Sequence, residues 1–131
     1  MIVVDTNIVA YLYLPGEHTA AVEALLTKEP DWAAPILWRS EFRNILATYV
    51  RSGRLSLAQA TDLQTEAEDV FDGSEFEVDS PTVLKLARES DCSAYDCEFV
   101  ALASMLDTKL VTMDKKILRA FPARCHALPP A

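Results

Sequence analysis

The chain has 131 residues, half of them hydrophobic, which suffices for one domain whose core needs no disulfide or structural metal. Its net charge of −8 argues against a surface coated with bases for nucleic acid, and no apolar run approaches the ~20 residues of a membrane span. Cys92, Cys97 and Cys125 form no CxxC pair and no leader-like segment precedes the first expected strand, so we expect reduced thiols and a cytoplasmic location.

The negative charge is concentrated in one stretch. Between Asp62 and Asp79 the chain has eight acids and no Lys or Arg, and since the whole chain has 20 acids and 12 bases, the remainder holds 12 of each. Eight of the 12 bases form two groups, each near a candidate acid, although such groups are also typical of a solvated helix face. They are Arg39, Arg43, Arg51 and Arg54, and Lys115, Lys116, Arg119 and Arg124.

Apolar periodicity and turn residues predict short strands alternating with helices. Strands are expected over 2–4, 32–34, 76–78, 109–112 and around 125–128. Helices are expected over 8–13, 18–28, 36–52, 57–71, 82–89, 93–106 and 115–120. Thr6 or Asn7 is the expected cap of the first helix, and Ser80, before Pro81, that of the fifth.

This alternation predicts an α/β fold with a central, mostly parallel twisted sheet flanked by helices on both faces. Residues 1–131 show no repeat, linker or low-complexity segment and are expected to form a single domain. The run Ile2–Val4 has no polar alternation, which favours a central strand buried on both faces.

Four acids occupy comparable places in this pattern. Asp5 follows the first strand, Asp114 follows the fourth, Asp96 lies in the first turn of a helix, and Glu41 lies at the edge of the apolar stripe of the helix over 36–52. Each has an ordinary explanation: Asp5 and Asp114 as caps or turn residues, Asp96 as a residue favoured by the helix dipole, and Glu41 as a surface partner of an arginine.

Taken together, the four acids suggest a site, because ligands of open α/β sheets bind at the carboxyl ends of the strands. Four carboxylates facing one crevice repel each other unless a cation is present, and Mg²⁺ or Mn²⁺ is the cation that such oxygen ligands suit. One or two ions there would activate water for hydrolysis of a phosphodiester.

Several motifs resemble those of PIN-domain nucleases, and within that family the VapC ribonuclease toxins of prokaryotic toxin-antitoxin pairs. They are Val3-Val4-Asp5-Thr6-Asn7, the helical Glu41, Ser93-Ala94-Tyr95-Asp96-Cys97 with Val100-Ala101-Leu102-Ala103, and Thr112-Met113-Asp114-Lys115-Lys116-Ile117-Leu118. The resemblance covers essentially the whole chain. It departs from the family at Cys97, where alanine is common, which places a thiol near the site.

The resemblance implies a Mg²⁺- or Mn²⁺-dependent endoribonuclease that leaves 5′-phosphate and 3′-hydroxyl ends. It implies that Asp5, Glu41, Asp96 and Asp114 bind the metal, with Thr6, Asn7 and Thr112 in support. The partners that it implies are RNA, a second copy of the chain, and an antitoxin with a basic or aromatic C-terminal segment. The bases that we expect to reach RNA are Arg39, Arg43, Lys115, Lys116 and Arg119.

Two other functions compete with the nuclease. A phosphatase could use Asp5 as nucleophile, but haloacid-dehalogenase-like enzymes, which this N-terminus also resembles, have a second acid two residues later, where this chain has Asn7. A catalytically silent PIN-like domain could serve as an acidic protein-interaction module, although it would not need all four acids. Cys125-His126 has no second pair at zinc-site spacing and is not expected to bind metal.

Overall fold

The centre of the protein is a five-stranded parallel sheet, seen here in a computed structural model that describes residues 1–131. The strand order is β3-β2-β1-β4-β5, and every neighbouring pair is parallel. The strands are β1 (Ile2–Val4), β2 (Trp32–Pro35), β3 (Glu75–Phe76), β4 (Leu110–Val111) and β5 (Cys125–His126). The predicted parallel α/β sheet is therefore confirmed.

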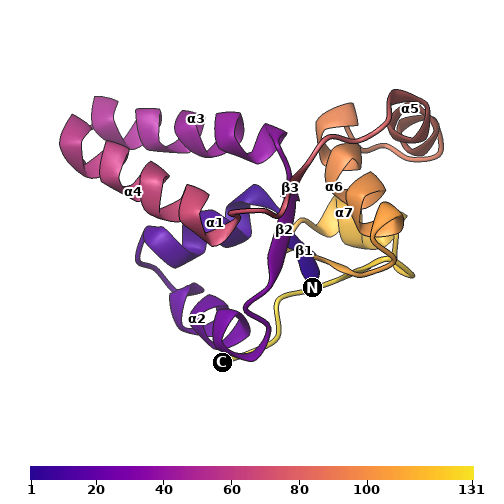
Figure 1. Ribbon diagram of the computed structural model, residues 1–131, viewed down its shortest axis with the longest axis horizontal. Helices are drawn as coiled ribbons and strands as arrows, with labels where there is room; N and C mark the ends of the chain where they lie inside the picture. Colours follow the sequence, from indigo (N-terminus) through magenta and orange to yellow (C-terminus); the bar gives the residue numbers. More distant parts are fainter.

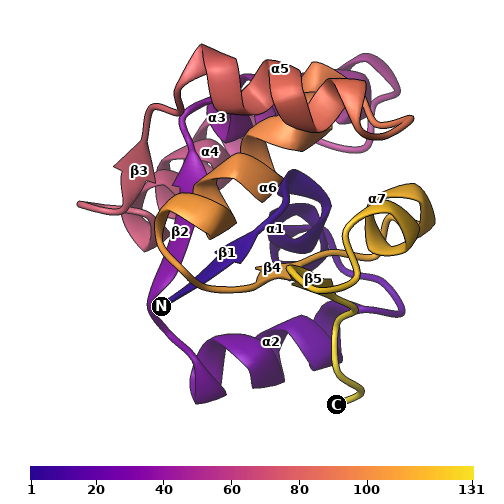
Figure 2. The same cartoon turned by 90° about the vertical axis from the view of Figure 1, so that its right-hand side faces the viewer.

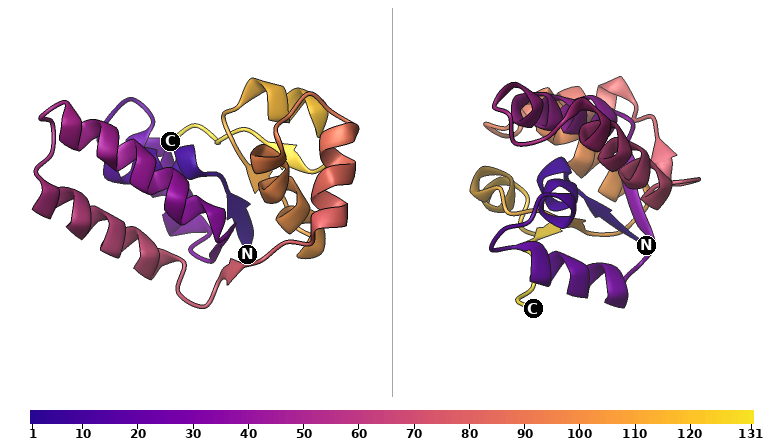
Figure 3. Two further views of the ribbon diagram at one scale, coloured as in Figure 1. Left: turned by 90° about the horizontal axis from the view of Figure 1, so that it is seen from above. Right: turned by 90° about the vertical axis from the view of Figure 1, so that its left-hand side faces the viewer.

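Seven helices cover the sheet. They are α1 (Thr6–Tyr13), α2 (Thr19–Lys28), α3 (Leu37–Arg51), α4 (Leu57–Val70), α5 (Ser80–Arg88), α6 (Ala94–Met105) and α7 (Lys115–Ala120). Helices α1 to α4 lie on one side of the sheet and α5 to α7 on the other, as predicted (Figure 1). Helices α3 and α4 form an antiparallel hairpin that extends beyond the sheet (Figure 3). None of the helices is long and apolar enough to cross a bilayer.

The topology places a crevice next to the central strand. Strand β1 pairs with β2 on one side, Val3 opposite Ala33, and with β4 on the other, Val3 opposite Leu110. The chain leaves β1 toward α1 on one face and leaves β4 toward α7 on the opposite face (Figures 1 and 2). The switch point of the sheet therefore lies between the carboxyl ends of β1 and β4, where ligands of open α/β sheets bind.

The core lies on both faces of the central strands β1 and β2. All three residues of β1 and all four of β2 are buried, since both faces of these strands carry helices. Trp38 and Phe42 of α3 are fully buried, with Leu46 one turn further along the same stripe. The Trp38 ring lies against Phe71, with ring centroids 4.6 Å apart, so the α3–α4 hairpin is anchored to the sheet by its aromatic residues.

Two predicted helix caps are wrong by one residue. Asp5, and neither Thr6 nor Asn7, caps α1, because its carboxylate accepts the Ile8 amide at 3.1 Å. Asp79 replaces Ser80 as the cap of α5 and accepts the Thr82 amide at 2.9 Å. In both cases an aspartate that directly precedes the predicted cap is itself a strong capping residue. Ser56 and Gln59 form a capping box at the start of α4.

The predicted strands differ from the observed ones mainly at their ends. Strand β2 includes Pro35, and β3 begins one residue earlier than predicted, because Glu75 pairs with Ala34. Strands β4 and β5 are limited to two residues each, shorter than predicted, and their neighbours join loops and helix caps instead.

Candidate active site

One pocket contains all four predicted acids. Asp5 after β1, Glu41 of α3, Asp96 of α6 and Asp114 after β4 line a cavity of about 410 Å³. These segments are up to 109 residues apart in the chain, from Asp5 to Asp114, and meet at the switch point between β1 and β4. The remaining lining residues are Thr6, Asn7, Leu37, Ser40, Asn44, Ile45, Tyr95, Phe99 and Ile117.

Asp5 is the buried acid at the base of the pocket, with a side chain only 7% exposed. One carboxylate oxygen accepts the Ile8 amide, and the other accepts a short hydrogen bond from the hydroxyl of Thr112. Burial, together with the charges of Asp114 and Glu41, raises the pKa of Asp5 to about 6, and the two hydrogen bonds oppose this rise. Asp5 therefore occupies a position where a negative charge is costly without a compensating cation.

Glu41 is held by α1 rather than by an arginine. The Thr6 hydroxyl donates to Glu41 Oε1 at 2.6 Å, so the residue after Asp5 fixes the second acid. Burial raises the pKa of Glu41, the Thr6 hydrogen bond opposes this, and the charge of Asp96 raises it again. The expectation of a surface ion pair for Glu41 is wrong, because α3 turns this residue inward.

Asp96 and Asp114 both lie at the start of a helix and are half-buried. Ser93 caps α6 by accepting the Asp96 amide at 3.1 Å, which places Asp96 in the first turn. Asp114 caps α7 by accepting the amides of Lys116 at 2.8 Å and Ile117 at 3.2 Å. Since the Asp114 amide donates to Thr112 Oγ1 at 3.0 Å, Thr112 joins the segments that carry Asp5 and Asp114.

The donor set of the pocket fits a hard divalent cation in its chemistry. All four acids offer carboxylate oxygens, the ligands that Mg²⁺ and Mn²⁺ prefer. The charges of Asp114 and Glu41 help to raise the pKa of Asp5, and the charge of Asp96 helps to raise the pKa of Glu41, as uncompensated like charges do. As the side chains stand, no three His, Cys, Asp or Glu residues are close enough to hold one ion together. Binding an ion would therefore require some of these carboxylates to rotate inward.

The comparison with known proteins agrees with this geometry. A sequence model of the PIN domain matches residues 2–121, nearly the whole chain. The chain belongs to the PIN-domain family. It is 31% identical to Ribonuclease VapC3 of Pyrobaculum aerophilum over 127 residues, which cover 93% of this chain and 95% of the relative. The predicted resemblance to PIN-domain VapC ribonucleases is thereby confirmed.

Solved structures show the same PIN fold. PAE2754 from Pyrobaculum aerophilum superposes with a TM-score of 0.76 at 22% identity, covering 97% of this chain and 83% of its own. A toxin-antitoxin complex from Klebsiella pneumoniae superposes with a TM-score of 0.71 at 14% identity, covering 100% of both chains. At these identities the likeness concerns the fold alone.

The predicted supporting residues of the PIN domain have different placements. Thr6 and Thr112 both donate hydrogen bonds to an acid of the pocket. Asn7 lines the pocket but is exposed and makes no side-chain hydrogen bond. Cys97 is fully buried, and burial raises the pKa of its thiol, so the expected thiol near the site is not accessible.

The predicted RNA-binding bases are not all near the acids. Arg39 faces away from the pocket, where its guanidinium pairs with Glu75 at 2.6 Å and with Glu68 at 3.0 Å. That engagement removes the reason to place Arg39 on an RNA path. Lys115, Lys116 and Arg119 are exposed on α7, directly after Asp114, and Lys116 Nζ donates to the Asp91 carbonyl at 3.4 Å.

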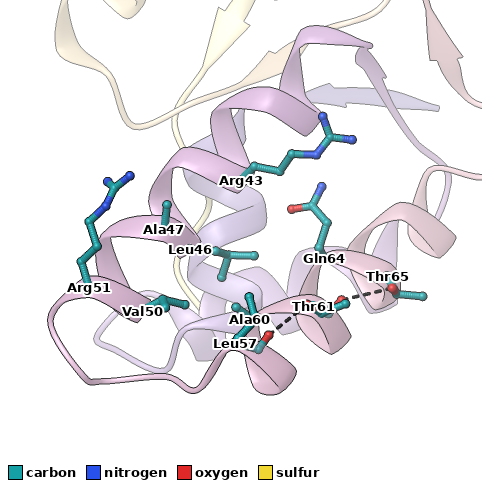
Figure 4. A pocket seen from close by; sticks show the side chains of 10 residues that line it. All are labelled: Arg43, Leu46, Ala47, Val50, Arg51, Leu57, Ala60, Thr61, Gln64 and Thr65. Carbon is teal, nitrogen blue, oxygen red and sulfur yellow. Dashed lines mark hydrogen bonds between the residues drawn. The ribbon is translucent and has the colours of Figure 1, made fainter.

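Arg43 borders a second groove, between α3 and α4 (Figure 4). Apolar side chains form its floor, among them Leu46, Val50 and Ala60, and Arg43 and Gln64 extend over it from the two helices. Gln64 Oε1 is buried there without a hydrogen-bond donor. None of the four acids lines this groove, whose volume is about 440 Å³.

Sequence reasoning missed residues that depend on contacts between distant segments. Glu75 accepts hydrogen bonds from Trp38 Nε1 at 2.8 Å and from Arg39, and so fixes the first turn of α3, which has no side-chain cap. The only signal in the sequence was an acid in a strand opposite a base near a helix start. Tyr95 was present in a recognised motif, but its exposure at the mouth of the pocket becomes visible only in the structure.

Proposed function

We propose that this protein is a metal-dependent endoribonuclease that acts as the toxin of a toxin-antitoxin pair. The observation that carries the proposal is the meeting of four acids in one pocket of a chain that belongs to the PIN-domain family. The 31% identity to Ribonuclease VapC3 over most of both chains supports RNA as the substrate.

The acids of the pocket carry the negative charge, and neighbouring hydrogen-bond donors hold some of them in position. Asp5 is buried and fixed from two sides by Ile8 and Thr112, so it provides a rigid carboxylate at the base of the pocket. Thr6 fixes Glu41 opposite the α6 acid. Asp96, half-buried in the first turn of α6, makes no side-chain hydrogen bond and can adjust to a ligand. Asp114 is held through Oδ1 by the Lys116 and Ile117 amides and can offer its other oxygen.

Mg²⁺ or Mn²⁺ is the cofactor that we propose for this site, held by Asp5, Glu41, Asp96 and Asp114. Such an ion supplies water activation and charge stabilisation on phosphate oxygens. The acids of the pocket would compensate the positive charge of the ion and hold the ion at the open side of the pocket. Lys115, Lys116 and Arg119, exposed beside Asp114, would attract the RNA backbone that the bare acids repel.

The geometry is unfavourable for the phosphatase alternative. A nucleophilic Asp5 would need a free carboxylate oxygen, but both oxygens accept hydrogen bonds and the side chain is 7% exposed. A silent interaction module would not require Thr6 and Thr112 to be aimed at the acids, where burial makes the charges costly. A nuclease accounts for both features.

An antitoxin is the partner that we propose for regulation, with a basic or aromatic C-terminal segment over the acidic pocket. An arginine there could make a bidentate contact with the carboxylates and offset their repulsion. The apolar groove between α3 and α4 is the surface that we expect a second segment of the antitoxin to cover (Figure 4). We also propose a homodimer through the exposed Ile36 and Leu84, which line one shallow groove.

The decisive experiment is cleavage of RNA by the purified protein with Mg²⁺ or Mn²⁺ and with EDTA. Asp5→Asn is the test variant, and Asp62→Asn, an exposed α4 acid without side-chain contacts, is the matched control. We expect chelator-sensitive cleavage by the wild type and Asp62→Asn and none by Asp5→Asn. Turnover of small phosphoesters without RNA cleavage would favour a phosphatase, and inactivity toward both substrates would favour the interaction module.

A further inference from the structure

Tyr95 is an exposed aromatic residue at the mouth of the acidic pocket. Its side chain is 63% exposed, and it lines the same cavity as the four acids. Six large hydrophobic residues of the chain are exposed, and Tyr95 is the only aromatic one among them. The others are Met1, Ile36, Leu57, Leu84 and Met105. None of these other five lines the acidic pocket.

No intramolecular interaction of its side chain explains why Tyr95 is exposed. Its phenol makes no hydrogen bond, and its ring belongs to no aromatic pair or cation–π contact in the structure. The backbone beneath it is nevertheless fixed, because Ser93 caps α6 and Asp96 follows in the same turn. The ring is therefore presented to solvent from a rigid support directly beside one of the acids.

Apolar side chains from the same elements as the acids form part of the wall of the pocket. Leu37 and Ile45 of α3 contribute half-buried side chains, and Phe99 and Ile117 contribute buried ones. Neither a cation nor a phosphate gains from such a wall, since both prefer polar ligands. A flat, partly apolar group of the substrate would gain from it, and in RNA that group is the nucleobase.

We propose that Tyr95 is a stacking platform for an unpaired nucleobase next to the phosphate that is cleaved. The proposal rests on the proposed ribonuclease function and adds a binding subsite to it. A base inside a duplex has both faces covered by its neighbours, so only a base in a single strand, loop or bulge can stack on Tyr95. The site therefore selects single-stranded or looped RNA over duplex RNA.

Cleavage kinetics provide the first test. We expect Tyr95→Leu to raise KM for a single-stranded oligonucleotide by about tenfold or more, because stacking on an aromatic residue contributes ~1–3 kcal/mol per base. The kcat should change by less than about twofold, since the acids are untouched, and Tyr95→Phe, which keeps the ring, should behave like the wild type. Met105→Ala, which truncates another exposed apolar residue outside the pocket, is the matched control.

A spectroscopic measurement provides the second test and does not depend on cleavage. The fluorescent base 2-aminopurine, placed at successive positions of the oligonucleotide, is titrated with Asp5→Asn protein and with the double variant Asp5→Asn/Tyr95→Leu. We expect a fluorescence change at one position with the first protein and none there with the second. Circular dichroism and melting curves verify that each variant is folded.

The outcomes separate this proposal from the proposed function. Equal KM values for wild type and Tyr95→Leu, or a 2-aminopurine signal that does not depend on Tyr95, would overturn the stacking proposal while leaving the ribonuclease intact. A wild-type protein that binds the oligonucleotide through Tyr95 but never cleaves RNA would count against the ribonuclease alone. Equal affinity for a duplex and a single strand would also overturn the stacking proposal.

Discussion

Replacing Asp5 with asparagine should stabilise the metal-free protein while abolishing its activity. Burial raises the pKa of Asp5 from 3.8 to about 6. Because one pKa unit corresponds to ~1.4 kcal/mol, the ionised Asp5 destabilises the native state by about 3 kcal/mol above pH 6. Asparagine removes that charge and can still accept the Ile8 amide.

The expected net gain is smaller than the electrostatic relief. Asparagine offers Thr112 an amide in place of a carboxylate oxygen, and we assign about 1 kcal/mol to the weakened hydrogen bond. At pH 7 the variant should therefore be about 2 kcal/mol more stable than the wild type, which for a chain of 131 residues corresponds to a melting temperature about 7 °C higher.

The pH dependence of this difference has a defined sign. Between about pH 4 and pH 6 the native protein binds a proton at Asp5 that the unfolded chain has already released, so wild-type stability falls as pH rises through this window. Asp5→Asn has no such loss. The advantage of the variant should be absent at pH 4, grow up to pH 6 and remain constant above it.

Urea denaturation in EDTA from pH 4 to pH 8 measures this difference, with Asp62→Asn as the control for loss of an exposed charge. Effects of acids that do not interact with Asp5 cancel when the two proteins are compared at one pH. An Asp5→Asn protein that is less stable than the wild type at pH 8, or a difference that does not change with pH, would refute the argument from burial.

Four further results are expected. Cleavage products should carry 5′-phosphate and 3′-hydroxyl ends, because neither histidine lines the pocket to activate a 2′-hydroxyl; end-labelling that finds 2′,3′-cyclic phosphate would contradict this. Thr6→Val should lower Mn²⁺ affinity about fivefold by releasing Glu41, and Thr6→Ser should restore it, as calorimetry can check. Replacing Lys115 and Lys116 with glutamine should lower the salt dependence of RNA binding by up to about 1.4 in logarithmic slope, and an unchanged slope would remove them from the RNA path. Mn²⁺ titrated into the co-purified antitoxin complex should displace the basic segment, and inhibition that persists without that segment would place the partner elsewhere.

The sequence predicted the sheet and the four acids because both depend on local patterns. An acid that follows an apolar run such as Ile2–Val4 indicates the end of a buried parallel strand. The topology of a parallel sheet then places such strand ends at the same edge. Asp114 was found by the same rule. Glu41 was singled out by its place at the edge of the apolar stripe of its helix, and the resemblance to PIN-domain nucleases then implied its role in the site.

The features that could not be predicted depend on pairs of distant residues. Glu75 and Arg39 are 36 positions apart, and only the fold reveals that this acid holds the Arg39 guanidinium. The predicted caps failed for another reason, since Asp5 and Asp79 each compete with a hydroxyl or amide residue directly after them. Periodicity cannot decide between adjacent capping residues, and the geometry of the preceding strand or loop decides instead.

The central strand β1 is translated before the strands on either side of it. Its neighbour β4 and the hydroxyl of Thr112 are made about a hundred residues later, and Thr112 is 107 positions from Asp5. At a translation rate of ~5–20 residues per second, Thr112 is added to the chain roughly 5–20 s after Asp5. Throughout that time its carboxylate stays hydrated, with neither Thr112 nor Asp114 beside it. The pocket of four acids can therefore assemble only after Thr112 and Asp114 have been translated.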